Sequence, residues 1–234
     1  MEENGRFYAV GVGPGDPSLL TLRAAEVLQR CPVIAAPQTA GGETAALKIA
    51  SRAVDLKEKT ILPLPFSMSR DPEVLAAAHV SAVQAVESHL ARGRDVAMLC
   101  LGDVSLYASA GAVLPALRRA GYEAELVPGV TSFSAAAAAL RLELAGGDEP
   151  LHIVPVLGED WKDSLSLPGT KVLMKPGSRL PSVFSWLAQH DLLGSSALVM
   201  NCGMEGERLL CPFDRLPEET GYFTLVIVKE GRIW

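Results

Sequence analysis

The stretch that decides the fold is VAMLCLGDVSLYAS, at residues 96–109. Residues 96–101 form an apolar run without alternation, which is typical of a parallel strand covered by helices on both faces. The run stops at Gly102 and Asp103, and Tyr107 follows closely. Open α/β sheets hold their ligands where the strands end. Taken alone, this polar end is therefore either a ligand site or a tight turn capped by Asp103.

The composition limits the class of protein. The chain has 234 residues, is 49% apolar and carries a net charge of −6, which argues against a general nucleic-acid binder. The four cysteines, Cys31, Cys100, Cys202 and Cys211, show no CxxC spacing, which favours reduced thiols over disulfides or a zinc site. No signal-peptide pattern or membrane-length apolar run is present. We therefore expect a cytoplasmic protein.

Apolar runs and helical patterns predict an α/β fold with two domains. Strands separated by helices favour a parallel sheet in the first part of the chain, and they are expected at residues 7–12, 33–36, 60–64, 96–101 and 124–127. After the GGDEP linker at 146–150, strands are expected at residues 151–157, 171–174, 197–201, 207–210 and 223–228. The last strands lack intervening helices, which predicts a mixed sheet with an antiparallel pair. The predicted domains are residues 1–130 and 148–234, with a connecting helix and linker at 131–147.

Two further loops stand at strand ends. GVGPGDP, at residues 11–17, joins a strand to a helix, which is a geometry that can cradle a cofactor. Its spacing departs from the dinucleotide fingerprint, and Pro14 removes a backbone donor, so a pyrophosphate is not expected. A structural strand-to-helix turn is the alternative. The third loop, PGVTS at residues 128–132, offers Thr131 or Ser132 as a helix cap.

The three motifs, in this order and at whole-domain spacing, resemble those of the tetrapyrrole (corrin/porphyrin) methylases, and the similarity covers nearly the whole chain. The resemblance implies the class III methyltransferase fold, with S-adenosyl-L-methionine bound between the domains, S-adenosyl-L-homocysteine as product and a homodimer. PFSMSRD at residues 65–71, the LGD loop and the linker resemble the enzymes that methylate C-20 of precorrin-2 or cobalt-factor II in cobalamin biosynthesis. Ser67 and Val104 stand where that subgroup usually carries proline.

Carried over position by position, the resemblance implies donor contacts in both domains. A carboxylate against the donor sulfonium would stabilise the ground state more than the transition state, so we expect Asp103 to bind the donor's amino group or to organise its loop. The implied contacts in the three loops are Pro14, Leu101, Gly102, Asp103, Leu106, Thr131 and Ser132. Those in the second domain are Met174, Gly203, Thr224 and Leu225.

The acceptor implied by the resemblance carries many carboxylates, which an acidic protein must meet with local cations. The candidates are Arg23, Arg70, Lys162, Lys175 and Arg179. A solvated Arg70 is the alternative for that residue. Tyr107 is the candidate to assist loss of the meso proton after methylation. The four histidines show no shared metal-ligand spacing, and methyl transfer requires no metal.

Three other functions remain open. One is methylation at another corrin-ring position or of uroporphyrinogen, on the same fold. A second, methylation of ribosomal RNA ribose, would need a basic face, against which the sequence pI of about 5.3 argues. The third is binding of a tetrapyrrole or nucleotide without catalysis, which predicts binding without turnover.

Overall fold

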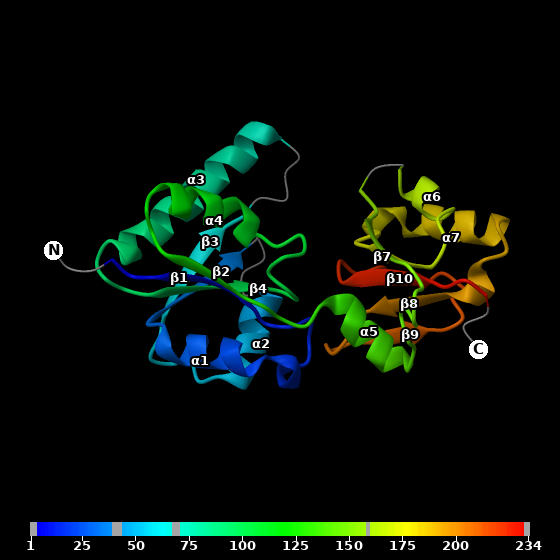
Figure 1. The fold of residues 1–234 in the computed structure, drawn as a ribbon, viewed down its shortest axis with the longest axis horizontal. Coiled ribbons are helices and arrows are strands. Elements are labelled where there is room, and N and C mark those ends of the chain that lie inside the picture. Colours follow the sequence, from blue (N-terminus) through cyan, green and yellow to red (C-terminus); the bar gives the residue numbers. More distant parts are fainter. Residues whose placement is uncertain (1–3, 39–43, 67–70, 158–159, 232–234) are drawn as a thin grey trace. The chain divides into compact units, whose positions relative to one another are not determined.

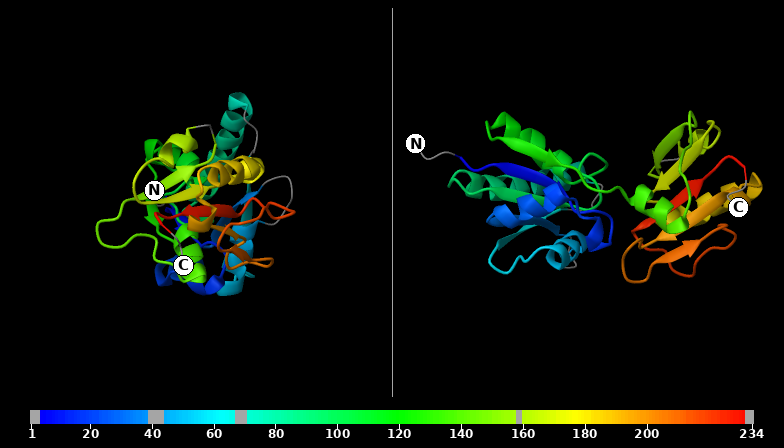
Figure 2. Two further views of the ribbon diagram at one scale, coloured as in Figure 1. Left: turned by 90° about the vertical axis from the view of Figure 1, so that its right-hand side faces the viewer. Right: turned by 60° about the horizontal axis from the view of Figure 1, so that its bottom comes forward.

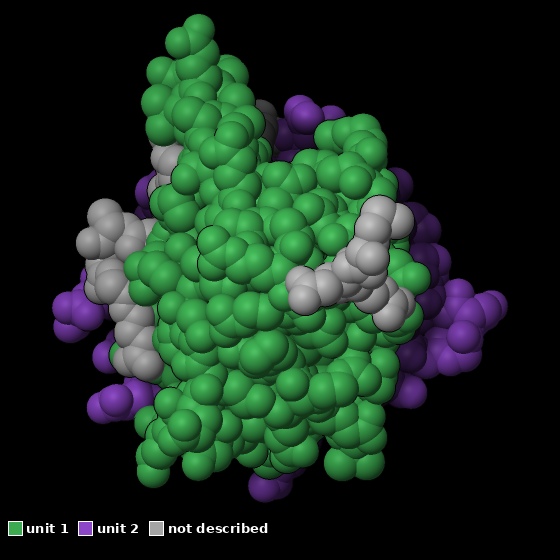
Figure 3. Space-filling model, turned by 90° about the vertical axis from the view of Figure 1, so that its left-hand side faces the viewer, with its two compact units in different colours: residues 1–131 green, residues 132–234 purple. Residues whose placement is uncertain are grey.

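The computed structural model describes residues 4–38, 44–66, 71–157 and 160–231. The chain divides into two compact units, residues 1–131 and 132–234, coloured separately in Figure 3. Among the described residues, no helix has the length and apolar character that a membrane crossing needs.

The first unit contains a five-stranded, wholly parallel sheet in the order β3-β2-β4-β1-β5. Helices α1 and α2 cover one face and α3 and α4 the other (Figure 1). The strands are β1 (Phe7–Gly11), β2 (Val33–Gln38), β3 (Thr60–Pro65), β4 (Val96–Cys100) and β5 (Ala124–Val127). The helices are η1 (Pro17–Leu19), α1 (Leu22–Arg30), α2 (Ala45–Ala53), α3 (Pro72–Leu90) and α4 (Ala110–Arg119). The parallel sheet expected from the sequence is confirmed.

Neighbouring strands β1 and β4 send the chain to opposite faces of this sheet. After β1 the chain continues into α1, and after β4 it continues into α4 on the other face (Figure 1 and Figure 2). In open α/β sheets, ligands bind beyond the carboxyl ends of the strands at such a reversal. The sheet order therefore directs attention to the loops after β1 and β4.

Burial explains why the central strand stays in place. All five residues of β4 are buried, and Met98 packs with Phe7, Leu64 and Val86 in the core that includes α3. Each large apolar side chain of this kind contributes about 1.5–3 kcal/mol when fully buried. The start of α3 also follows its sequence, since Asp71 accepts a 2.9 Å hydrogen bond from Glu73 N as the helix cap.

The second unit contains the mixed sheet that the sequence predicts, with its strands in the order β6-β7-β10-β8-β9. Strand β6 is parallel to β7, while β10 is antiparallel to both β7 and β8. Helix α5 lies on one face, and α6 and α7 lie on the other (Figure 1). The strands are β6 (Leu151–Pro155), β7 (Thr170–Met174), β8 (Ser196–Met200), β9 (Arg208–Leu210) and β10 (Thr224–Val228). The helices are α5 (Ser132–Leu140), α6 (Trp161–Ser164), η2 (Gly177–Arg179), α7 (Leu180–Gln189) and η3 (Leu193–Ser195).

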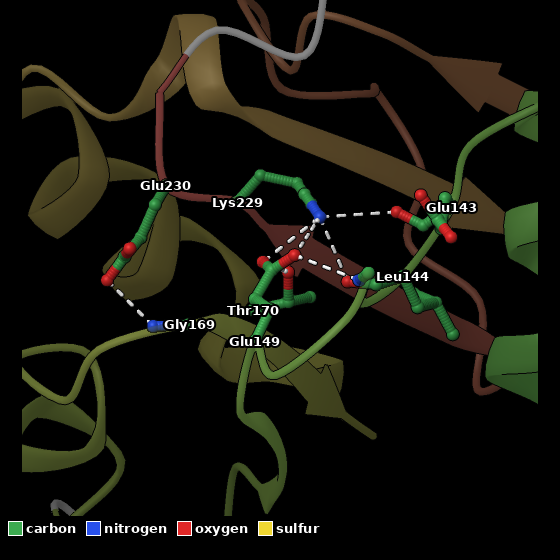
Figure 4. Close-up of polar contacts among 8 residues, drawn as sticks. Glu143, Leu144, Glu149, Gly169, Thr170, Lys229 and Glu230 are labelled. Atoms are coloured by element: carbon green, nitrogen blue, oxygen red, sulfur yellow. Dashed lines mark hydrogen bonds and ion pairs between the residues drawn. The ribbon is translucent and has the colours of Figure 1, made fainter.

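A side-chain network holds the linker of the second unit against its sheet (Figure 4). Lys229 Nζ lies 3.0 Å from both carboxylate oxygens of Glu149 and donates to the carbonyls of Glu143 and Leu144 over 3.2 and 3.0 Å. Thr170 Oγ1 donates to Glu149 over 2.7 Å. Because Thr170 begins β7 and Lys229 follows β10, the network lies at one end of the sheet, and Met174 and Thr224 lie at the opposite end.

Candidate functional site

The first two loops meet over the carboxyl ends of β1 and β4. Gly13 N donates to Gly102 O over 3.2 Å, and Gly102 N donates to Gly13 O over 2.9 Å. One residue earlier, Val12 N donates to Cys100 O over 2.9 Å. The two loops are therefore joined backbone to backbone. They meet where the chain leaves β1 toward α1 on one face of the sheet and leaves β4 toward α4 on the other.

The third loop reaches the same place because its glycine carries no side chain. A Cβ added at Gly129 would lie 2.2 Å from Gly102 O and 2.8 Å from Gly11 C. A Cβ added at Gly11 would lie 2.7 Å from Gly129 N. These neighbours are backbone atoms, which cannot rotate away as a side chain can. Gly11 and Gly129 therefore require glycine for their close approach to each other and to Gly102 O, and the three residues are here called the glycine contact.

Asp103 ties the central loop to the third loop. Its Oδ2 accepts a 2.8 Å hydrogen bond from Gly129 N, while Oδ1 accepts from Ser105 N over 2.8 Å and from the Ser105 hydroxyl. Burial by itself would raise the pKa of Asp103, but the hydrogen bonds from Ser105, Gly129 and Val104 outweigh it and lower the pKa. The ionised carboxylate thus organises the loops, which is one of the two roles expected for it.

The other donor-contact candidates of the first unit lie in the same loops. Pro14 is buried directly after Gly13, whose φ of 76° is left-handed. A Cβ added at Gly102 would lie at an ordinary contact distance of 3.9 Å from Val130 O, its nearest neighbour. The half-buried candidates are Leu101, Leu106 and Thr131. Ser132 begins α5 and belongs to the second unit.

Tyr107 lies in the loop between β4 and α4 with an unusual backbone. Its φ is 53°, and 47% of the residue is exposed. A left-handed conformation is uncommon for a residue other than glycine, and such strain gathers at functional sites. Tyr107 therefore contributes little to the core for a residue of its size.

In the second unit, β10 brings the remaining donor-contact candidates to one end of the sheet, where β7 and β8 finish and β10 begins. This end of the sheet is called its edge below. Leu225 pairs with Met174 of β7, and Thr224 pairs with Met200 of β8. Gly203 follows β8 in the adjoining loop, where its backbone N donates to Glu207 Oε2 over 2.6 Å. The candidates from three separate stretches of sequence therefore share the edge formed by the end of β7, the start of β10 and the end of β8.

Asn201 and Tyr222 lie at this same edge, and the sequence analysis missed both. Asn201 follows β8 with a φ of 51°, and Tyr222 lies just before β10. The Lys175 ammonium lies 6.0 Å from the centroid of the Tyr222 ring. The available signal was an asparagine directly after a buried strand, because asparagine adopts the left-handed conformation more readily than most residues.

The basic candidates lie on different elements. Lys175 follows β7 with a φ of 55°, and Arg179 ends η2 shortly after it. Lys162 lies on α6, with its ammonium 5.8 Å from the Trp161 ring centroid. Arg23 is ion-paired with Glu125 at 3.0 Å and with Glu26 at 3.3 Å. Arg70 lies outside the described residues.

The described residues include no group of three or more histidine, cysteine, aspartate and glutamate side chains arranged to hold a metal ion. Cys31 and Cys100 are buried and form no disulfide. Burial raises the pKa of both Cys31 and Cys100 to about 12, which keeps these thiols protonated.

Comparison with known proteins agrees with this geometry. The family described as Tetrapyrrole (Corrin/Porphyrin) Methylases matches residues 6–217. Cobalamin biosynthesis protein CobIJ of Mycobacterium tuberculosis is 33% identical over 242 residues, which cover 99% of this chain and 47% of that protein. The chain therefore spans about half the length of that relative. The probable cobalt-precorrin-2 C(20)-methyltransferase of Methanocaldococcus jannaschii is 34% identical over 230 residues, covering 96% of both chains.

A solved structure shares the fold as well. The cobalt precorrin-4 methyltransferase CbiF superposes with a TM-score of 0.72 at 19% identity, covering 96% of this chain and 94% of that one. The family match covers all strands of the first sheet, strands β6 to β9 of the second sheet and the three loops of the first unit. The chain belongs to the tetrapyrrole (corrin/porphyrin) methylase family.

Proposed function

We propose that the chain is an S-adenosyl-L-methionine-dependent C-methyltransferase of cobalamin biosynthesis that methylates C-20 of precorrin-2 or of its cobalt-containing counterpart. The observation that carries the proposal is the glycine contact, which joins the three loops that bear the family's motifs. Similarity to a C-20 methyltransferase over almost the whole of both chains supports the acceptor.

The geometry of the first unit supports S-adenosyl-L-methionine as the methyl donor. The backbone at Gly102 is not crowded, since an added Cβ would lie 3.9 Å from its nearest neighbour, and Pro14 carries no backbone N–H of the kind that binds a pyrophosphate. When bound, the donor supplies a methyl group already activated by the positive charge on sulfur. We assign Pro14, Leu101, Gly102, Asp103, Leu106, Thr131 and Ser132 to its binding, with Met174, Gly203, Thr224 and Leu225 from the second unit.

The chain's own contribution is to hold the donor and acceptor carbon in line, an effect that can supply roughly 7–11 kcal/mol. Asp103 keeps the loops in register through Gly129 and Ser105. Tyr107 is assigned to the loss of the meso proton, which restores conjugation. The acceptor's carboxylates are assigned to basic side chains that form charge-assisted hydrogen bonds. These are Arg23, Arg70, Lys162, Lys175 and Arg179.

The test is transfer of an isotopically labelled methyl group from S-adenosyl-L-methionine to purified precorrin-2 and, separately, to its cobalt form. Mass spectrometry counts the methyl groups added, and NMR identifies the ring position. One methyl group at C-20 is expected, and comparison of the two acceptors shows which is preferred. The Gly111→Ala variant is the control for any glycine substitution in the loops, since a Cβ at Gly111 meets nothing within 4 Å.

The other outcomes identify the competing functions. A methyl group at another carbon of the ring, or transfer only to uroporphyrinogen, would assign the chain to a different member of the family. Binding of the acceptor without transfer would make it a non-catalytic tetrapyrrole-binding protein.

We also propose that the chain acts as a homodimer in the cytoplasm. The family resemblance supports the dimer, and the free thiols are consistent with a reducing compartment. Light scattering after size-exclusion chromatography measures the assembly directly. A mass of one chain at micromolar concentration would contradict the dimer.

A further inference from the structure

Five described residues other than glycine have a left-handed backbone, and they fall into two groups. Arg141 and Asp191 follow helices α5 and α7, where a left-handed residue ordinarily ends a helix. The others follow strands whose ends carry the proposed donor contacts: Tyr107 after β4, Lys175 after β7 and Asn201 after β8. Backbone strain at strand ends of this kind gathers at functional sites.

Asn201 connects two segments that carry proposed donor contacts. Its backbone N donates to Phe223 O over 2.8 Å, which holds the segment before β10. Its backbone O accepts from Met204 N over 2.8 Å, and its side-chain Nδ2 donates to Gly206 O over 3.3 Å. These bonds close the loop after β8, which contains Gly203.

The side-chain amide also lies between two glycines. A Cβ added at Gly206 would lie 3.5 Å from Asn201 Nδ2, and a Cβ added at Gly221 would lie 3.5 Å from Asn201 Oδ1. Thr224 Oγ1 in turn donates to Gly221 O over 2.6 Å. Asn201 therefore packs against the start of the segment that leads into Thr224, while it bonds to the loop around Gly203.

We propose that Asn201 is a positioning residue for donor binding. It sets the spacing between the loop at residues 202–207 and the segment at residues 221–225, without being assigned a contact to the donor itself. The inference rests on the proposed function, because that function supplies the donor and the roles of Gly203 and Thr224.

The test compares Asn201→Gly and Asn201→Asp with Asp191→Gly in the full chain. Glycine accepts the left-handed backbone at either position, so Asn201→Gly removes the amide without adding strain. Asn201→Asp keeps the shape but replaces the Nδ2 donor with an acceptor facing Gly206 O. Asp191→Gly is the matched control, because it changes a left-handed residue at a helix end.

Calorimetry measures the dissociation constant of S-adenosyl-L-homocysteine, and steady-state kinetics measures the acceptor KM. Loss of the amide should raise the dissociation constant about tenfold, the scale of one net hydrogen bond. The acceptor KM should change less than about twofold, and Asp191→Gly should match the wild type in both. A general loss of folding would shift both constants. An unchanged dissociation constant in Asn201→Gly overturns the proposal.

Hydrogen exchange in the ligand-free protein separates this inference from the proposed function. Asn201→Gly should accelerate exchange in both segments, residues 202–207 and 221–225, while Asp191→Gly leaves both unchanged. Acceleration in one segment alone contradicts the coupling. If the wild type binds no S-adenosyl compound, the proposed function fails, and the exchange data still decide whether Asn201 couples the two segments.

Discussion

The proposed donor contacts lie at the strand ends of each sheet, here called the two edges, and these edges are built by different means. In the first unit, backbone meets backbone: Gly11 and Gly129 approach each other and Gly102 O within distances that exclude a Cβ on either glycine. In the second unit, a side chain takes part as well: the Asn201 amide bonds Gly206 O within the loop after β8, while the Asn201 backbone N bonds Phe223 O before β10. The first edge has no room to adjust, whereas the second depends on bonds that can be removed singly.

This difference predicts how each edge responds to mutation. A side chain inserted among backbone atoms forces the strands themselves to move, so the cost is large and falls on folding. A side-chain hydrogen bond that is lost costs only its net contribution, about 0.5–1.5 kcal/mol for a neutral pair. Substitutions in the first unit should therefore affect stability and binding together, while those in the second should separate them.

The largest effect is expected at Gly129. Gly129→Val places a Cβ 2.2 Å from Gly102 O, and such overpacking against backbone should destabilise the chain by about 3 kcal/mol or more. Chemical denaturation measures the free energy of unfolding, and calorimetry measures donor binding, which should be lost. Gly111→Ala on α4 is the control and should be neutral or slightly stabilising. Normal stability in Gly129→Val would break the contrast between the two edges.

A smaller effect is expected at Asp103. Asp103→Asn removes the charge from an acceptor of three hydrogen bonds, so we expect a loss of about 2–3 kcal/mol at neutral pH. Because the folded pKa is lowered, this stability is present above the unfolded pKa of about 3.9 and is lost as pH falls through the folded pKa. Unfolding curves of both proteins should converge in acid. A difference that is independent of pH would contradict the role of the charge.

These contrasts also explain what the sequence could reveal. Apolar runs predicted the strands, because that signal is local. The glycine contact was not predicted, since it depends on β1 lying between β4 and β5 in the sheet. In the second unit, the last strand β10 inserts between β7 and β8. No local pattern encodes that insertion, so Asn201 and Tyr222 were missed.

Lys229 should give a moderate effect on stability alone. Lys229→Met removes the cation that bonds Glu149 and the carbonyls of Glu143 and Leu144, and we expect a loss of about 1–2 kcal/mol. The Glu149 pKa is lowered by the Thr170 hydrogen bond and by Lys229, so its contribution is lost as pH falls through the folded pKa. The network lies at the far edge of the sheet, so donor affinity should not change. Weaker donor binding in this variant would contradict the separation of the two edges.

The smallest effect is expected at Arg23. The acceptor KM of an Arg23 variant in the first unit is compared with that of a Lys175 variant in the second. Arg23 is half-exposed and already paired with Glu125 and Glu26, and exposed pairs of this kind contribute little to stability. Arg23→Gln should therefore leave the melting temperature unchanged, and it should raise the acceptor KM only up to about twofold, because its guanidinium is already shared with two carboxylates. Lys175→Gln, beside Met174 at the candidate edge, should raise the acceptor KM several-fold because a charge-assisted bond to a carboxylate is lost. Steady-state kinetics measures the acceptor KM of both variants. A larger rise in KM for Arg23→Gln than for Lys175→Gln would indicate that the acceptor's carboxylates bind near α1 and strand β5.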